Sequence, residues 1–285
     1  MPLLAIPNLS VARPGDILDK ASGAIQRAGS RLLDLHSDEV HNRSVLTVTG
    51  PGDALIEAMM ALAEVCKGID LSAHEGVHPR VGTFDVCPFV PHEVSMDDAI
   101  SAAHMAGTKI GNDVGIPVFF YGAASMRTET RELPDLRRGG LEGLIHRIAH
   151  GLSPDAGPSE VDPSVGVACV GARGPLIAFN VWLNASSDVA EAIASAVRER
   201  GRIRALGLPM GQGRCQVSMN LVAPGDVGIE DAFARVQTAA MERAADIIAT
   251  EIIGLVPERY APSPDATVTR LLVEPGHWLG SALDD

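Results

Sequence analysis

Two histidines, a glutamate and an arginine fall within the seven residues from His74 to Arg80. Imidazole side chains can ligate a metal or transfer protons near neutral pH, and a neighbouring carboxylate can assist either task. The first five of these residues also match the His-Glu-x-x-His pattern of zinc peptidases. The segment therefore allows two incompatible hypotheses, a zinc site or a metal-free acid–base site.

The zinc hypothesis requires both histidines on one face of a helix. His78 directly precedes Pro79, and a proline pushes the residue before it out of the α region. Gly76 would cost about 1 kcal/mol inside a helix. His92 or His104 could be nominated as a third ligand, but neither matches a known downstream pattern. We therefore predict a loop without a bound metal.

Within a loop, His78 is a candidate general acid and base, held in place by the proline that follows it. Arg80 could hold a carboxylate, and Gly82 would allow close approach of the backbone. The alternative is a polar turn whose histidine and arginine only solvate the surface. The residue types alone leave both interpretations open.

The composition narrows the class of protein. The 285 residues are 46% hydrophobic and 21% charged, as in ordinary globular proteins, and carry a net charge of −13. This charge argues against nucleic-acid binding, because no basic stripe offsets it. The four cysteines are scattered in apolar contexts, which indicates core residues in a reducing compartment. With no apolar run of transmembrane length and no secretory pattern at the N-terminus, we expect a cytoplasmic protein.

Apolar periodicity predicts the elements that must position the candidate loop. The first ninety residues follow the order β-α-β-β-α-β, with a polar loop at 36–43 between the two central strands. Ser95 and Asp98 form a capping-box start for a further helix. The strands are expected at 3–6, 31–35, 44–49 and 83–90, the first two helices at about 17–28 and 55–66, and another strand at 118–121.

The same order of elements returns in the last third of the chain. Asp188 is expected to cap a helix, with Glu191 three residues later. Strands are expected at 176–183, 203–208, 214–222 and 252–256, with a second helix from about 229 to 248. We therefore predict an α/β (α+β) protein of two ferredoxin-like β-α-β-β-α-β subdomains, residues 1–173 and 174–285.

The segment from Gly76 to Pro91 closely resembles the signature of glutamate formiminotransferases. Similarity continues from about residue 3 to residue 257 in one order. It includes Pro7-Asn8, Asn42-Arg43, Pro117-Val118, Gly157-Pro158-Ser159, Gly171-Ala172-Arg173, Leu176-Ile177-Ala178-Phe179-Asn180 and Gly254-Leu255-Val256-Pro257. This resemblance implies transfer of a formimino group from N-formiminoglutamate to tetrahydrofolate in histidine catabolism. It also implies a substrate groove between the two subdomains and a homodimer.

The resemblance assigns roles to particular residues. It makes His78 catalytic, with tetrahydrofolate as co-substrate and no metal. Arginines suit the carboxylates of the donor and of folate, and amides suit the pterin. For each asparagine, a bond to its own backbone is the alternative. The expected folate-binding residues are Gly157, Pro158, Ser159, Ser164, Gly166, Asn8 and Asn180, and the expected substrate-binding residues are Arg80, Arg43, Asn42 and Arg173.

Two departures from the family pattern bear on the donor. The chain has Leu9-Ser10-Val11-Ala12 where family members commonly have Phe-Ser-Glu-Gly. His36 stands where many members carry an aspartate that assists the catalytic histidine, so Asp38 or Glu75 is expected to supply the negative charge. We expect this protein to lack the cyclodeaminase domain of the bifunctional enzymes, so that a second protein would process the product.

These departures keep other functions open. One alternative retains the fold and transfers a formyl or other amidine group from a different donor. Another is a non-catalytic folate-binding protein that retains the groove. The zinc peptidase remains a distant third alternative.

Overall fold

The computed structural model describes residues 3–13, 15–274 and 278–284. The chain divides into two compact units, residues 1–174 and 175–285, and each is described by itself. Among the described residues, no helix is both long and apolar enough to span a membrane.

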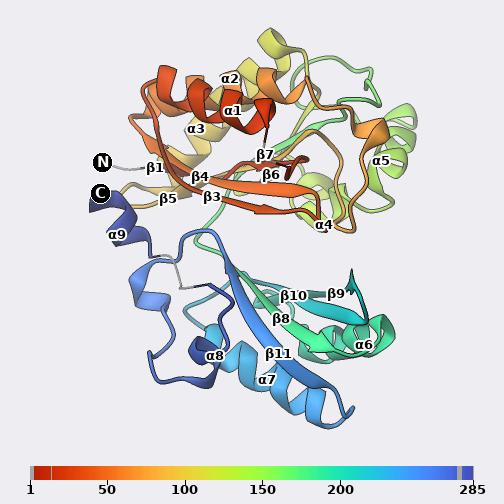
Figure 1. The fold of residues 1–285 in the computed structure, drawn as a ribbon. Coiled ribbons are helices and arrows are strands. Elements are labelled where there is room, and N and C mark those ends of the chain that lie inside the picture. Colours follow the sequence, from red (N-terminus) through yellow and green to blue (C-terminus); the bar gives the residue numbers. More distant parts are fainter. Residues whose placement is uncertain (1–2, 14, 275–277, 285) are drawn as a thin grey trace. The chain divides into compact units, whose positions relative to one another are not determined.

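The first unit begins with the predicted order of elements (Figure 1). Its strands β5, β1, β4 and β3 are neighbours in that order and pair antiparallel, which is the ferredoxin-like arrangement. The short strand β2 also lies between β4 and β5. The bounds are β1 Leu3–Ala5, β2 Asn8–Leu9, α1 Asp16–Arg27, β3 Arg31–Asp38, β4 Arg43–Gly50, α2 Gly52–Cys66 and β5 Phe84–Pro91.

Two further strands extend this sheet beyond β5. Strand β7 pairs parallel with β5, and β6 pairs parallel with β7, so the amino ends of all three strands meet at one edge. The elements are α3 Met96–Lys109, the π-helix Ile110–Val114, β6 Val118–Gly122, α4 Leu133–Leu136, α5 Gly140–Ala149 and β7 Ala168–Ala172. The predicted capping box of α3 is confirmed, because Ser95 and Asp98 exchange side-chain and backbone hydrogen bonds.

Apolar residues pack on both faces of the extended part of this sheet. Helices α1, α2 and α3 cover one face with a large core that includes Leu55, Met59 and Leu62, all fully buried. On the other face, Leu136 of α4 and Leu144 of α5 join a smaller core. This double cover explains why β5 is an almost continuous apolar run rather than an alternating one.

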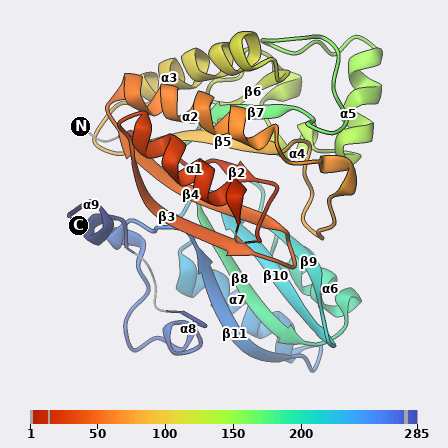
Figure 2. The same ribbon diagram turned by 45° about the horizontal axis from the view of Figure 1, so that its top comes forward.

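The second unit repeats the ferredoxin-like arrangement with four antiparallel strands (Figure 2). The strand order is β11-β8-β10-β9, and α6 and α7 share one core with the sheet. Residues 177, 179, 181 and 183 of β8 all belong to this core, as period-two alternation requires. The bounds are β8 Ile177–Asn184, α6 Ser187–Val197, β9 Ile203–Gly211, β10 Arg214–Leu221, α7 Ile229–Met241 and β11 Asp246–Ile253; after them, short helices α8 and α9 span Thr267–Arg270 and Leu279–Asp284.

Three local predictions were wrong. The helix predicted to reach residue 248 ends at Met241, because Ala244 adopts φ 50° and Asp246–Ile253 instead pairs with β8. Ser186, rather than Asp188, caps α6, since its hydroxyl accepts from the Val189 amide. The loop predicted at 36–43 is shorter, because β3 continues to Asp38 in register with Arg43 of β4.

Candidate functional site

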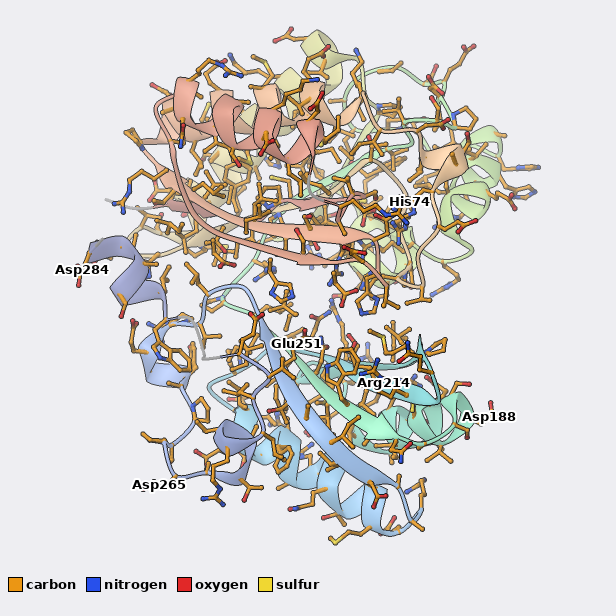
Figure 3. All side chains as sticks on the ribbon, in the orientation of Figure 1. His74, Asp188, Arg214, Glu251, Asp265 and Asp284 are labelled. Carbon is orange, nitrogen blue, oxygen red and sulfur yellow. The ribbon has the colours of Figure 1, made fainter. Side chains whose placement is uncertain are left out.

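The segment from His74 to Gly82, here called the signature loop, is a loop as predicted. It follows the short 3₁₀ helix Leu71–Ala73 and leads into β5. His74 lies at the end of the first sheet, where its ring contacts the carbonyl of Asn42 (Figure 3). Because no helix carries this segment, its two histidines do not share a helical face. In the described part of the chain, no three His, Cys, Asp or Glu side chains gather to hold a metal.

Arg80 ties the signature loop to the turn between β3 and β4. Its Nη2 donates to the carbonyl of His41 at 2.7 Å, and its Nη1 donates to the carbonyl of Asn42 at 3.1 Å. Its Nε and Nη2 both donate to the carbonyl of His78, and Nη1 also contacts the ring of His74. Four of the five N–H donors of the guanidinium therefore meet backbone carbonyls, and the fifth faces the His74 ring. These contacts leave at most one donor for a substrate carboxylate, fewer than the two of a bidentate pair.

Asn42 is the counterpart of Arg80 on the turn. It adopts φ 46°, a left-handed conformation that asparagine tolerates. Its side-chain oxygen accepts from the Ala12 amide at 3.1 Å, and its side-chain nitrogen donates to the Glu75 carbonyl at 3.0 Å. A Cβ on Gly76 would lie 2.4 Å from the His41 carbonyl oxygen. The turn and the loop are thus packed backbone against backbone, and Asn42 serves this junction.

His78 is half-buried and bonded at both ring nitrogens. Its Nε2 lies 2.7 Å from Nη1 of Arg43, and its Nδ1 lies 2.9 Å from the Pro79 carbonyl oxygen. An arginine only donates and a carbonyl only accepts, so Nε2 is the acceptor and Nδ1 carries the proton. Burial, followed by the charges of Arg43 and Arg137, holds the pKa of His78 well below its usual value. The ring is therefore neutral, with the lone pair of Nε2 directed at Arg43.

Three residues near His78 were not predicted to belong to the site. Arg137, at the end of α4, forms an ion pair with Asp85 of β5, which is 2% exposed. Asp85 also accepts from the Val81 amide at 2.8 Å. The ring of His41 meets the ring of His78 edge-on, with centroids 5.8 Å apart. Asp85 lies inside the signature motif, which could have indicated it, whereas Arg137 carries no local sequence signal.

The three residues predicted to assist His78, which are His36, Asp38 and Glu75, lie in different surroundings. Asp38 accepts from the His41 amide at 2.8 Å and lies across from Arg43 in the sheet. His36 lies across from Val45 in the sheet, two residues before Asp38 on β3. The side chain of Glu75 is exposed, while its carbonyl binds Asn42.

The expected folate-binding segment, residues 157–166, divides into two parts. Its end runs beside the signature loop, because Gly166 bridges to Gly82 and the Ser164 carbonyl accepts from the Leu71 amide at 2.7 Å. The Ser164 hydroxyl and amide both bond to Asp162. Gly157 instead packs on Gly111 of the π-helix, and Pro158 and Ser159 are exposed. All of these residues lie near the amino ends of β5, β6 and β7.

The other three predicted residues bond to protein groups other than His78. Asn8 donates to the Ile6 carbonyl at 3.1 Å, which is the backbone alternative. Arg173 follows β7, and its amide donates to Phe89, about 16 Å along β5 from its first residue. Asn180 belongs to the second unit, where its amide donates to Glu251 of β11 at 2.9 Å (Figure 3).

A cavity of about 880 Å³ opens beside the junction of turn and loop. Its walls come from the first unit and include His74, Asn42 and the altered segment after Leu9. The lining residues are Ser10, Val11, Arg13, Glu39, Val40, Asn42, Ile69, Asp70, Ala73, His74, Glu75, Gly76 and Val77. A small-molecule substrate could therefore reach this side of the signature loop.

Comparison with known proteins identifies the family. The N-terminal subdomain of the formiminotransferase domain matches residues 3–173, and the formiminotransferase domain matches residues 178–261. The chain belongs to the formiminotransferase family. The resemblance predicted from the signature motif is thereby confirmed over both units.

Relatives of two lengths share this similarity. The glutamate formimidoyltransferases of Streptococcus pyogenes serotype M1 and Thermoplasma acidophilum are each 34% identical over 89% of this chain and 88% of their own length. The formimidoyltransferase-cyclodeaminase of Dictyostelium discoideum is 35% identical over 88% of this chain. The chain spans about half the length of the bifunctional relatives that it matches.

Gly82→Ala is expected to prevent normal folding of the first unit. A Cβ at this position would lie 1.9 Å from the Val167 carbonyl oxygen and 3.1 Å from its nitrogen, where backbone cannot give way locally. The strands β5 and β7 would have to separate, so we expect a loss of at least about 3 kcal/mol or insoluble protein. Urea unfolding and soluble yield measure the effect, with Gly174→Ala as the control, since nothing lies within 4 Å of a Cβ there. Equal stability of the two variants would contradict this prediction.

Acid is expected to destabilise the folded protein through His78. Its lowered pKa means that the folded state keeps the ring neutral, whereas the unfolded chain binds a proton below about pH 6.5. This contribution is complete above about pH 6.5 and is lost as the pH falls from there toward the lowered pKa of the folded state. The same sign applies to His74, whose pKa is lowered by burial and by Arg80. The free energy of unfolding, measured with urea at several pH values, should fall less steeply toward acid pH for His78→Gln than for the wild type.

Proposed function

We propose that this protein transfers a formimino group from N-formiminoglutamate to tetrahydrofolate, giving 5-formiminotetrahydrofolate and glutamate. Membership of the formiminotransferase family supports this reaction, as do relatives named glutamate formimidoyltransferase that match nearly their whole length. The observation that carries the proposal is the neutral His78, whose Nε2 lone pair lies in a cationic setting.

His78 has the properties that this reaction requires. A bond forms between N5 of tetrahydrofolate and the formimino carbon, and the bond from that carbon to the glutamate nitrogen breaks. His78 accepts the proton that N5 loses and returns it to the departing nitrogen, so its own protonation state is restored. A histidine that begins neutral can take the first proton at physiological pH.

Arg43 is proposed to bind a carboxylate of the substrate. Among the described residues, the one hydrogen bond of its side chain runs from Nη1 to His78, and the side chain is half-buried at the amino end of β4. A carboxylate that drew this guanidinium away would release Nε2 of His78 for catalysis. Substrate binding and activation of the base would then be one event.

The residues beside the signature loop are proposed to bind folate. Ser164 and Gly166 run next to the Val81–Thr83 backbone, and Pro158 and Ser159 expose their surfaces at the same sheet edge. For Arg173, Asn8 and Asn180 the proposed binding roles rest on the family resemblance, because the side chains of these residues bond to other protein groups.

The family resemblance also leads us to propose a cytoplasmic homodimer. The four cysteines are buried as free thiols, which suits a reducing compartment. Light scattering after size-exclusion chromatography tests the dimer, because a mass near 60 kDa is expected from two chains of 29.8 kDa.

A donor screen with tetrahydrofolate tests the reaction. The purified protein is mixed with tetrahydrofolate and, in turn, formiminoglutamate, a formyl donor and other amidines, and the substituted tetrahydrofolate that each donor would give is followed by absorbance. Turnover with formiminoglutamate is expected. Turnover with another donor alone would assign a different transferase, as the altered Val11-Ala12 and His36 positions could permit. Tight folate binding without any turnover would favour a folate-binding protein instead.

A further inference from the structure

Two arginine–aspartate pairs in the first unit have nearly the same construction. Arg137 pairs with Asp85, whose Oδ1 accepts from the Val81 amide at 2.8 Å. Arg127 pairs with Asp155 at 3.0 Å, and Oδ2 of Asp155 accepts from the Phe120 amide at 2.8 Å. In each pair the side chain of the aspartate is at most 5% exposed. Each pair fixes a connecting segment to the backbone of the sheet.

The two pairs differ in what surrounds them. Arg127 lies over the ring of Phe119, with its guanidinium carbon 5.9 Å from the ring centroid, and also donates to the Ser153 carbonyl. Arg137 pairs with Asp85, which accepts from the amide of Val81, three residues after His78 in the signature loop, and from this place its charge acts on both His78 and Arg43. The Val81 amide that anchors Asp85 belongs to the signature loop itself. One pair is therefore built into the site, and the other is not.

The electrostatic setting of His78 is unusually positive for an acidic protein. In the described residues, the charged or titratable groups around it come from six segments of the chain. They are Arg43 on β4, His41 on the turn before it, Asp38 on β3, Asp85 on β5, Arg137 after α4, and His74, Glu75 and Arg80 on the loop itself. Glu75 is exposed to solvent, and among the groups that are not exposed three arginines face two carboxylates, so one positive charge is left over there. A second positive charge on the imidazole is correspondingly disfavoured.

We propose that Arg137, anchored by Asp85, is a positioning residue that keeps His78 unprotonated and therefore ready to act as a base. This inference rests on the proposed acid–base function of His78. Arg137 acts through the imidazole rather than on the substrate. Once His78 has taken the proton from the attacking nitrogen, the nearby cation also makes that proton easier to return to the departing one.

The experiment removes the charge at position 137 in the full-length protein. Arg137→Met and Arg137→Gln both lose the cation, and the glutamine keeps an amide that can bond to Asp85. Arg137→Lys keeps the charge. Arg127→Met is the matched control, because it breaks an equivalent pair away from His78. The pH dependence of kcat/KM is measured with tetrahydrofolate and formiminoglutamate, and His78 is titrated by NMR after assignment through His78→Gln.

Loss of the charge at position 137 is expected to move two quantities to higher pH by about one pH unit. They are the acid limb of the kcat/KM profile and the midpoint of the NMR titration of His78. Arg137→Lys and Arg127→Met should keep the wild-type midpoint, even where Arg127→Met lowers stability. An unchanged midpoint in either folded charge-removing variant would overturn the inference, and so would an equal change in Arg127→Met. The NMR titration needs no turnover, so a wild type without activity would refute the proposed function while this test still decides the role of Arg137.

Discussion

His78→Ala is expected to lower kcat for formimino transfer by about 10²- to 10⁴-fold, the contribution that general acid–base catalysis typically makes. The substitution removes the group that takes the proton from the attacking nitrogen and gives it to the departing one. The substitution also removes two hydrogen bonds of the imidazole ring, the one that Arg43 donates to it and the one that it donates to the carbonyl of Pro79. KM for both substrates should therefore change much less than kcat. Steady-state kinetics measure both parameters.

His150→Ala is the matched control for this substitution. His150 is exposed at the end of α5, where its ring bonds to the carbonyl of His146. Circular dichroism and thermal unfolding should show that both variants fold as the wild type does. Activity of His78→Ala within a few-fold of the control would refute the catalytic role. It would favour the alternative that His78 belongs to a polar turn and only solvates the surface.

The general arrangement of the chain could be predicted from its sequence because it depends on local signals. Pro79 and Gly76 sufficed to exclude a helix in the signature loop. Apolar stripes predicted the order of strands and helices in both units, and this order is sufficient for two ferredoxin-like sheets. The prediction failed at Ala244, where a helical-looking stretch turns left-handed and the following residues pair with β8. Pairing between distant strands overrode local propensity there.

The interior of the site could not be predicted, because its contacts join segments far apart in the sequence. Asp85 and Arg137 are 52 residues apart, and Arg137 lies in a polar connector where four arginines have similar surroundings. The role of Arg80 depends on the carbonyl groups of His41 and Asn42, which every residue possesses. Side-chain chemistry alone suggested a carboxylate partner. In the structure its donors meet these backbone carbonyls instead.

The position of the candidate site on the sheet also constrains its mechanism. In parallel sheets, ligands usually bind at the carboxyl ends of the strands. Here the signature loop and residues 164–166 lie at the amino ends of β5 and β7, where two glycine backbones cross in direct contact. Gly166 adopts φ 78°, and a Cβ on it would lie 2.3 Å from the Val81 carbonyl oxygen. The loop that carries His78 is therefore fixed from two sides, by this crossing and by Arg80.

Arg80→Met is expected to disorganise the signature loop and to lower kcat by at least about 100-fold. The carbonyls of His41, Asn42 and His78 lose their donors together, which should cost about 2–4 kcal/mol in the free energy of unfolding. Burial lowers the pKa of Arg80 to about 10, so the wild-type guanidinium is still charged at neutral pH. Arg80→Lys should recover little, because an ammonium cannot reproduce the planar fork that reaches both segments. Urea unfolding and steady-state kinetics give the two quantities.

The kinetic pattern separates this positioning role from the carboxylate-binding role that the sequence suggested. A residue that binds the donor carboxylate equally in the ground and transition states would raise KM for the donor and leave kcat unchanged. A residue that holds His78 in place should lower kcat, with a smaller change in KM. Arg131→Met serves as the control, since Arg131 is exposed in the same unit. A pure KM effect in Arg80→Met, with wild-type stability, would show that Arg80 leaves its carbonyl partners to bind substrate.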